Sequence, residues 1–123
     1  MIPGTAPDPE QLWLQQLRQA SAWFGTPPGQ QLLDEEVRLL RPALERCFGR
    51  YLLHYSPGLG WPLQLPQIGS CIRLGPPLPG LDLHCQEQAW PVAGQVADVV
   101  VLQHALDFSR DPHALLREAA RCV

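Results

Sequence analysis

Polar side chains that could bind a ligand follow two strand-like segments in the second half of the chain. Gln86 and Glu87 follow one segment, and His104 and Asp107 follow the next. Parallel strands end at one edge of a sheet, where ligands of open α/β sheets bind. There, the first pair would accept hydrogen bonds from an amino group, Trp90 would stack on a ring, and His104 would bind a ligand or transfer a proton. Structural roles fit as well: a polar loop with one anchoring aromatic, and a histidine that caps local backbone.

A glycine-rich turn forms a second candidate site. The stretch SPGLG follows another strand-like segment, and its Gly58 and Gly60 have the G-x-G spacing that lets backbone approach a phosphate or a nucleotide. Only two glycines are present and no clear helix follows, so an ordinary turn explains the stretch equally well. The next strand-like segment ends at Gly75, with no acidic residue before Asp82, which argues against tight recognition of a ribose.

Composition argues against several other classes of protein. The formal charge of the 123 residues is −3, and all nine basic residues are scattered arginines, so a basic patch for nucleic acid is not expected. The four cysteines show no C-x-x-C spacing, and the first ten residues lack the charge and apolar core of a secretory signal, which favours reduced thiols and a cytoplasmic protein. No apolar run approaches the roughly 20 residues of a membrane span. Residues with metal-ligand chemistry lack a recognised spacing: His54, His84, Cys85 and His104.

The periodicity of apolar residues predicts a single domain of the α/β class. Residues 1–48 form a helical region, and residues 49–123 form a parallel sheet of about four strands. Pro42 is expected to end or kink the second helix. The predicted elements are helices over 8–24, 30–40 and 112–122, and strands over 50–55, 70–75, 81–86 and 97–103.

The last third of the chain resembles a known family in detail. Over about residues 86–123 it is similar to the class I S-adenosylmethionine-dependent methyltransferases, in the small-molecule group called type 11. The matching residues are Trp90-Pro91, Asp98, Val99 to Leu102, His104-Ala105-Leu106, and Asp111-Pro112 through Leu115, Leu116 and Glu118. Upstream, LLDEEVRLLRPAL and RYLLHY stand in the family's order with weaker similarity.

The resemblance implies a partial Rossmann-like fold, S-adenosylmethionine as cofactor and a small-molecule methyl acceptor. The residues that it places around the cofactor are Gly58, Gly60, Gln86, Glu87 and His104. Departures are also clear. His54 stands where the family has an acid, Gly75 lies at or near the place of the ribose carboxylate, and Gln86 replaces an adenine-side Asp. The family continues with a fifth strand after the last helix, so the chain is interpreted as the N-terminal half of the fold, truncated before that strand and weak or inactive as an enzyme.

The apolar run Val99–Leu102 leads to an alternative function. In the family's strand order this run forms an open edge of the sheet, and an apolar edge strand is a site for pairing with another chain. The alternative is therefore a non-catalytic, methyltransferase-like protein that self-associates or binds a protein partner through this edge. An unrelated α/β binding domain is a third interpretation.

Overall fold

The centre of the protein is a four-stranded sheet in which all paired strands are parallel, in the order β3-β2-β1-β4. The computed structural model describes residues 4, 6, 8–57 and 64–123. This architecture confirms the predicted α/β class and is consistent with a partial Rossmann-like fold. The strands are β1 (Gly49–Tyr55), β2 (Ile68–Gly75), β3 (Leu83–His84) and β4 (Val99–Leu102).

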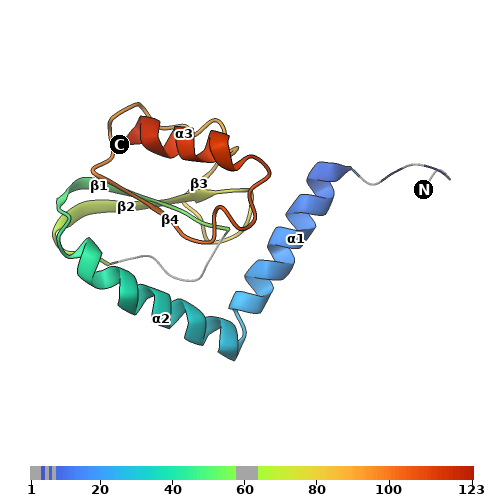
Figure 1. Ribbon diagram of the computed structural model, residues 1–123, viewed down its shortest axis with the longest axis horizontal. Helices are drawn as coiled ribbons and strands as arrows, with labels where there is room; N and C mark the ends of the chain where they lie inside the picture. Colours follow the sequence, from blue (N-terminus) through green and yellow to red (C-terminus); the bar gives the residue numbers. More distant parts are fainter. Residues whose placement is uncertain (1–3, 5, 7, 58–63) are drawn as a thin grey trace.

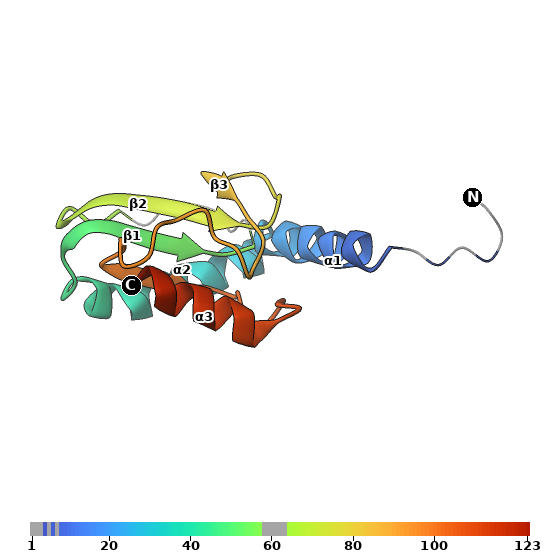
Figure 2. The same ribbon diagram turned by 90° about the horizontal axis from the view of Figure 1, so that it is seen from above.

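Three helices occur in the described part of the chain, and two of them cover the sheet. The helix α3 (Pro112–Cys122) covers one face and α2 (Pro27–Leu44) covers the other, whereas α1 (Pro9–Phe24) lies beyond the ends of the strands (Figure 1). The view from above shows the same arrangement, with α1 extending away from the sheet (Figure 2). Among the described residues, no helix has both the length and the apolar character needed to cross a membrane.

The sheet buries apolar side chains on both faces, as parallel sheets do. On the α3 side, Leu53 and Tyr55 of β1 pack with Leu115 of α3. On the α2 side, Leu52 of β1 packs with Leu44 of α2. Neighbouring residues of β1 therefore point to opposite faces, and each face contributes to a separate cluster of the core.

Helix starts follow the sequence signals. Asp8 Oδ1 accepts a hydrogen bond from the backbone N–H of Glu10 at 3.1 Å, and Asp111 Oδ1 accepts one from Ala114 at 3.1 Å. A proline follows each of these two N-caps, at the first position of its helix. The predicted bounds of the last helix, 112–122, are confirmed.

Other bounds differ from the prediction. The helix α2 runs from Pro27 to Leu44, so it does not end at Pro42 as one of the two expectations for this proline had it. Buried Leu44, in the turn that includes Pro42, packs against Leu52 of β1. The strand β3 has two residues in place of the predicted six. It pairs with β2 at only two positions, and a bridge between Gln86 and Ala89 turns the chain away immediately afterwards.

Candidate functional site

The candidate site lies where β1 and β4 end side by side. The central strand β1 pairs with β2 on one side and with β4 on the other, and all of these strands run in the same direction. The connection that leaves β1 leads to β2, whereas β4 is reached from β3 at the opposite side of the sheet. Such a reversal of strand order opens a crevice at the carboxyl ends of the strands, and ligands of open α/β sheets bind there.

His104 follows the end of β4 and is held between two carboxylates. Its Nδ1 lies 2.9 Å from Asp107 Oδ2, and its Nε2 lies 2.7 Å from Glu36 Oε2 on α2. The ring of Phe24 is 4.8 Å from the imidazole ring, centroid to centroid. Burial opposes the charged form of His104, but its hydrogen bonds to Asp107 and Glu36 outweigh burial and raise its pKa. Both ring nitrogens of His104 are therefore engaged by carboxylates.

The backbone of His104 is also unusual. Its φ of 51° lies in the left-handed region, which few residues other than glycine adopt. The turn that this conformation produces directs the imidazole from the end of β4 back toward α2. His104 thus fastens α2 to the loop after β4, which is a structural role, and neither ring nitrogen offers a lone pair to a substrate.

A second histidine continues the same network. His54 of β1 donates from Nε2 to Gln103 Oε1 at 2.9 Å, and Gln103 Nε2 donates to Glu36 Oε1 at 3.3 Å. Burial lowers the pKa of His54 to about 4; the hydrogen bond to Gln103 opposes this change, and the charge of Arg73 adds to it. His54 is therefore neutral at physiological pH, and β1 ends without the acid that the methyltransferase pattern has at this place.

Glu87 is buried, and its carboxylate binds the loop after β4. Its Oε1 accepts a hydrogen bond from the backbone N–H of Arg110 at 3.0 Å, and its Oε2 accepts one from the hydroxyl of Ser109. Gln86 is exposed, and its side chain accepts a hydrogen bond from Gln88 at 3.1 Å. The side chains of Gln86 and Glu87 thus have separate partners and do not converge on one point.

Trp90 has an internal partner too. Its ring is buried and stacks on the ring of Tyr55, with centroids 5.1 Å apart and planes 6° from parallel. Of the two roles predicted for Trp90, this stacking corresponds to that of an anchoring aromatic, because the Trp90 ring packs on Tyr55 inside the protein. The predicted Gly58 and Gly60 lie outside the described residues. No group of three His, Cys, Asp or Glu side chains within residues 8–57 and 64–123 is arranged to hold a metal ion.

Gly75 has a structural reason to be glycine. A Cβ atom at this position would lie 2.3 Å from the backbone oxygen of Ser56, a distance that real Cβ atoms do not show. The end of β2 therefore has no room for a carboxylate side chain. Asp82, the next acid, accepts a hydrogen bond from the backbone N–H of Arg73 at 2.8 Å. The glycine at this position therefore follows from the close approach of two backbones.

The helix α1 covers the crevice, which sequence patterns did not indicate. Trp13 Nε1 donates to the backbone oxygen of Phe108 at 2.6 Å, and the guanidinium of Arg110 lies 4.0 Å from the centre of the Trp13 ring. The described residues leave a cavity of about 10 Å³ there, room for about one water molecule. It is lined by Trp13, Leu17, Tyr55, Pro57, Pro76, Glu87, Ala105, Phe108 and Ser109.

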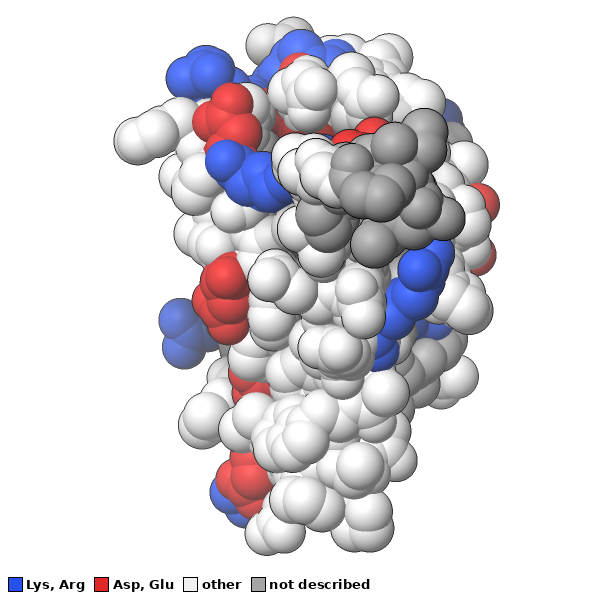
Figure 3. Space-filling view, turned by 90° about the vertical axis from the view of Figure 1, so that its right-hand side faces the viewer, with Lys and Arg blue, Asp and Glu red and all other residues white. Residues whose placement is uncertain are grey.

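Three buried side-chain atoms near the end of β1 have no hydrogen-bond partner among the described residues: His54 Nδ1, Trp90 Nε1 and the hydroxyl of Ser56. Ser56 directly follows β1 and is fully buried. Buried polar groups are nearly always hydrogen-bonded, so this hydroxyl is a candidate hydrogen-bonding group for a ligand at the end of β1. On the face of the molecule shown in Figure 3, basic and acidic side chains are scattered among uncharged ones and do not gather by sign.

Comparison of the chain with protein-family models, with curated proteins and with solved structures found no match in any of the three.

Proposed function

We propose that the chain is a methyltransferase-like domain that binds S-adenosylmethionine at the crevice between the ends of β1 and β4. The observation that carries the proposal is the all-parallel order β3-β2-β1-β4, which places the reversal of strand order beside β1. Topology alone supports a nucleotide-like ligand. The resemblance over residues 86–123 specifies the ligand as a sulfonium cofactor, whose chemistry is transfer of a methyl group to a nucleophile.

The side chains at the crevice fit the adenine of such a ligand better than its ribose. The unpartnered hydroxyl of Ser56 would hydrogen-bond a polar atom of the ligand, and the rings of Trp13 and Phe108 would contact an adenine. The ribose end receives no carboxylate from Gly75, and Glu87 is already engaged by Ser109 and Arg110. Binding is therefore expected to be weaker than in a site with a ribose carboxylate.

Ligand binding would compete with the docking of α1. A nucleoside is far larger than the 10 Å³ that the described residues leave, so α1 would withdraw from the crevice when the cofactor binds. The contacts that α1 makes with the loop after β4 include one hydrogen bond from Trp13, one contact with Arg110, and apolar packing of Leu14 and Leu17. Only molecules in which α1 is undocked would bind the cofactor, so the apparent affinity is reduced in proportion to the fraction of such molecules.

Catalysis by this site is expected to be slow. Methyl transfer depends mainly on holding the methyl group in line with its acceptor. Among the described candidates, His104 has no free ring nitrogen and Glu87 no free carboxylate oxygen directed to the crevice. We therefore propose cofactor binding as the main property of the domain, with a small-molecule acceptor and a slow transfer reaction.

A thermal melt with and without S-adenosylhomocysteine tests this proposal. Ligand at about 100 times its Kd adds roughly 2.7 kcal/mol to the free energy of unfolding, which raises the Tm by several degrees for a domain of this size. The variant Ser56→Ala should lose most of this shift, and the control Ser70→Ala, on the exposed part of β2, should keep it. A cooperative melt that does not change with ligand in the wild-type chain would contradict the proposal.

A further inference from the structure

The sheet has a free edge at β4. This strand pairs with β1 on one side only, and among the described residues no segment pairs with its other side. Its four residues are Val99, Val100, Val101 and Leu102, of which only Val101 is fully buried. Proteins usually protect an edge strand with charge, proline or a bulge, and none of these occurs within β4.

An apolar stripe of α2 lies beside this edge. Glu36 reaches the residues directly after β4, since it binds both Gln103 and His104. Leu32 and Leu39, four residues before and three after Glu36, share its side of the helix. Their side chains are 40% and 76% exposed.

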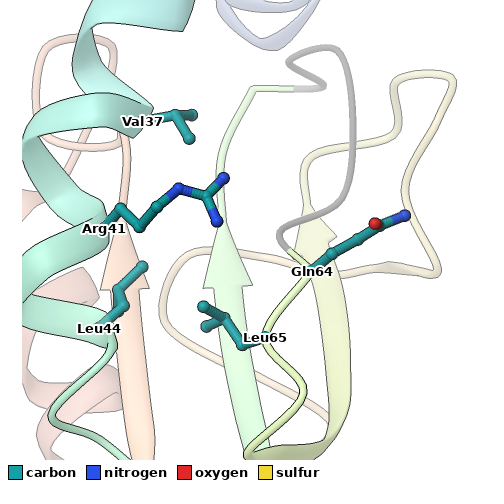
Figure 4. Close-up of a pocket in the computed structure, with 5 residues that line it drawn as sticks. All are labelled: Val37, Arg41, Leu44, Gln64 and Leu65. Carbon is teal, nitrogen blue, oxygen red and sulfur yellow. The ribbon is translucent and has the colours of Figure 1, made fainter.

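The opposite side of α2 faces the part of the sheet nearer β2. Arg41 projects from α2 away from β4, toward Gln64 and Leu65, which precede β2 (Figure 4). Leu39, two residues before Arg41, is almost opposite to it on the helix, so helix geometry places Leu39 on the side of β4. The exposed leucines of α2 therefore border the free edge.

The helix α3 presents a leucine on the same side of the molecule. Glu118 accepts a hydrogen bond from the backbone N–H of Trp90 at 2.8 Å, and Arg121 donates to the backbone oxygens of Trp90 and Val92. That loop lies over β1, β2 and β3. Leu116, two residues from Glu118, projects from the opposite side of α3, toward β4, and is 44% exposed.

We propose that this surface is the interface of a symmetric dimer of the chain. The edge surface is defined here as the free edge of β4 with Leu32, Leu39 and Leu116. A two-fold axis normal to the sheet would set β4 antiparallel to β4 of a second copy, and the two sheets would become one sheet of eight strands. The axis would also bring α2 against α2, and α3 against α3, of the other copy.

The composition of the edge surface favours a second copy over a lone strand. A single peptide strand would satisfy the backbone of β4 and leave Leu39 and Leu116 in water. A partner with a helix on each face of its own edge strand covers all three layers, and this chain has that construction. Two acidic residues next to this edge already have partners, Glu36 with His104 and Asp98 with two backbone N–H groups of β1, which favours the approach of a second copy carrying the same two acids.

Sedimentation velocity of the purified chain tests the proposal. The wild-type chain should be a dimer at micromolar concentration, and the double variant Leu39→Glu/Leu116→Glu should raise the dissociation constant at least ~10-fold, equivalent to about 1.4 kcal/mol. The control is Leu12→Glu, because Leu12 is 44% exposed, like Leu116, but lies on α1. This control should dimerise like the wild type. Circular dichroism of each variant confirms that it is folded.

Hydrogen exchange locates the interface. The amides of Val99–Leu102 should exchange more slowly in the wild-type dimer than in the double variant, whereas those of α1 should not differ. Three results would overturn the proposal. These are a monomer at ~100 μM, a dimer that the double variant leaves intact, and assemblies that keep growing with concentration, as an interface that does not close on itself produces. None of these measurements requires the cofactor.

Discussion

The ion pairs of His104 should make the stability of the protein depend on pH in a defined direction. The folded-state pKa of His104 is raised, so its contribution is complete below the pKa of the unfolded chain, about 6.5, and is lost as the pH rises through the folded-state pKa. The stability that the two ion pairs contribute should therefore decrease as the pH rises above about 6.5.

The exposure of the two carboxylates sets how much the His104 ion pairs contribute to the free energy of unfolding. Asp107 is 61% exposed, so its pair with His104 contributes about 0.5 kcal/mol, and Glu36 is 28% exposed, so its pair contributes about 1 kcal/mol. The variant His104→Asn removes both pairs, and asparagine tolerates the left-handed backbone at this position. At pH 6 we expect His104→Asn to lose about 1.5 kcal/mol, or roughly 6 °C in Tm.

The assay is the Tm of both proteins at several pH values from 5 to 9. The contact of the imidazole with Phe24 is lost at every pH, so it changes the baseline and not the slope. His54 is present in both proteins, so its titration cancels in their difference. The difference in Tm should shrink as the pH rises above 6.5. A difference that stays constant or grows toward pH 9 would refute the ion-pair account of His104.

Three further variants test the packing of the candidate site. In Gly75→Ala, the new Cβ would meet the backbone oxygen of Ser56, so urea denaturation should show a loss of about 2–3 kcal/mol; Gly94→Ala, whose Cβ would have ordinary contacts, should lose less than about 1 kcal/mol, and equal effects would contradict the close approach. In Glu87→Gln, one of the two groups that donate to Glu87, the Ser109 hydroxyl or the Arg110 backbone N–H, would face an amide N–H. We expect a loss of about 1–3 kcal/mol in the free energy of unfolding by the same assay. A neutral effect would argue that the carboxylate is free. The folded-state pKa of His54 is depressed to about 4, so the wild-type chain should lose about 3 kcal/mol as the pH falls from 6.5 to 4, and His54→Gln should lose much less; equal acid sensitivity in the two proteins would contradict a buried neutral His54.

The sequence predicted the elements whose signals are local. The run Val99–Leu102 becomes a strand because its β-branched residues suit a sheet buried on both faces. The pairs Asp8-Pro9 and Asp111-Pro112 begin helices because an N-cap and a proline at the first position act within one turn. The parallel arrangement followed from strands that alternate with connections, and the order β3-β2-β1-β4 matches the order that the resemblance implies.

The candidate site was harder to predict, because its side chains are defined by distant partners. Nothing in the spacing of His104 indicates that Glu36, far earlier in the chain, binds its Nε2. Glu87 reads as a free carboxylate until the loop after β4 folds back and donates two hydrogen bonds to it. The docking of Trp13 on Phe108 is equally a contact between remote segments.

Gly75 shows a different limit of sequence patterns. From the sequence it represents a missing carboxylate, which suggests loss of function. In the structure, β1 and β2 end so close together that no side chain fits, so glycine is required by packing. The reason for glycine at this position is thus one that only the three-dimensional arrangement provides.

The most direct test of the proposed function is isothermal titration calorimetry of the purified chain with S-adenosylhomocysteine. We expect saturable binding of one ligand per chain, a dissociation constant at least ~10-fold higher in Ser56→Ala, equivalent to about 1.4 kcal/mol, and wild-type binding in Ser70→Ala. Absence of binding to the folded wild-type chain, or equal affinity in Ser56→Ala, would contradict a cofactor site at the end of β1.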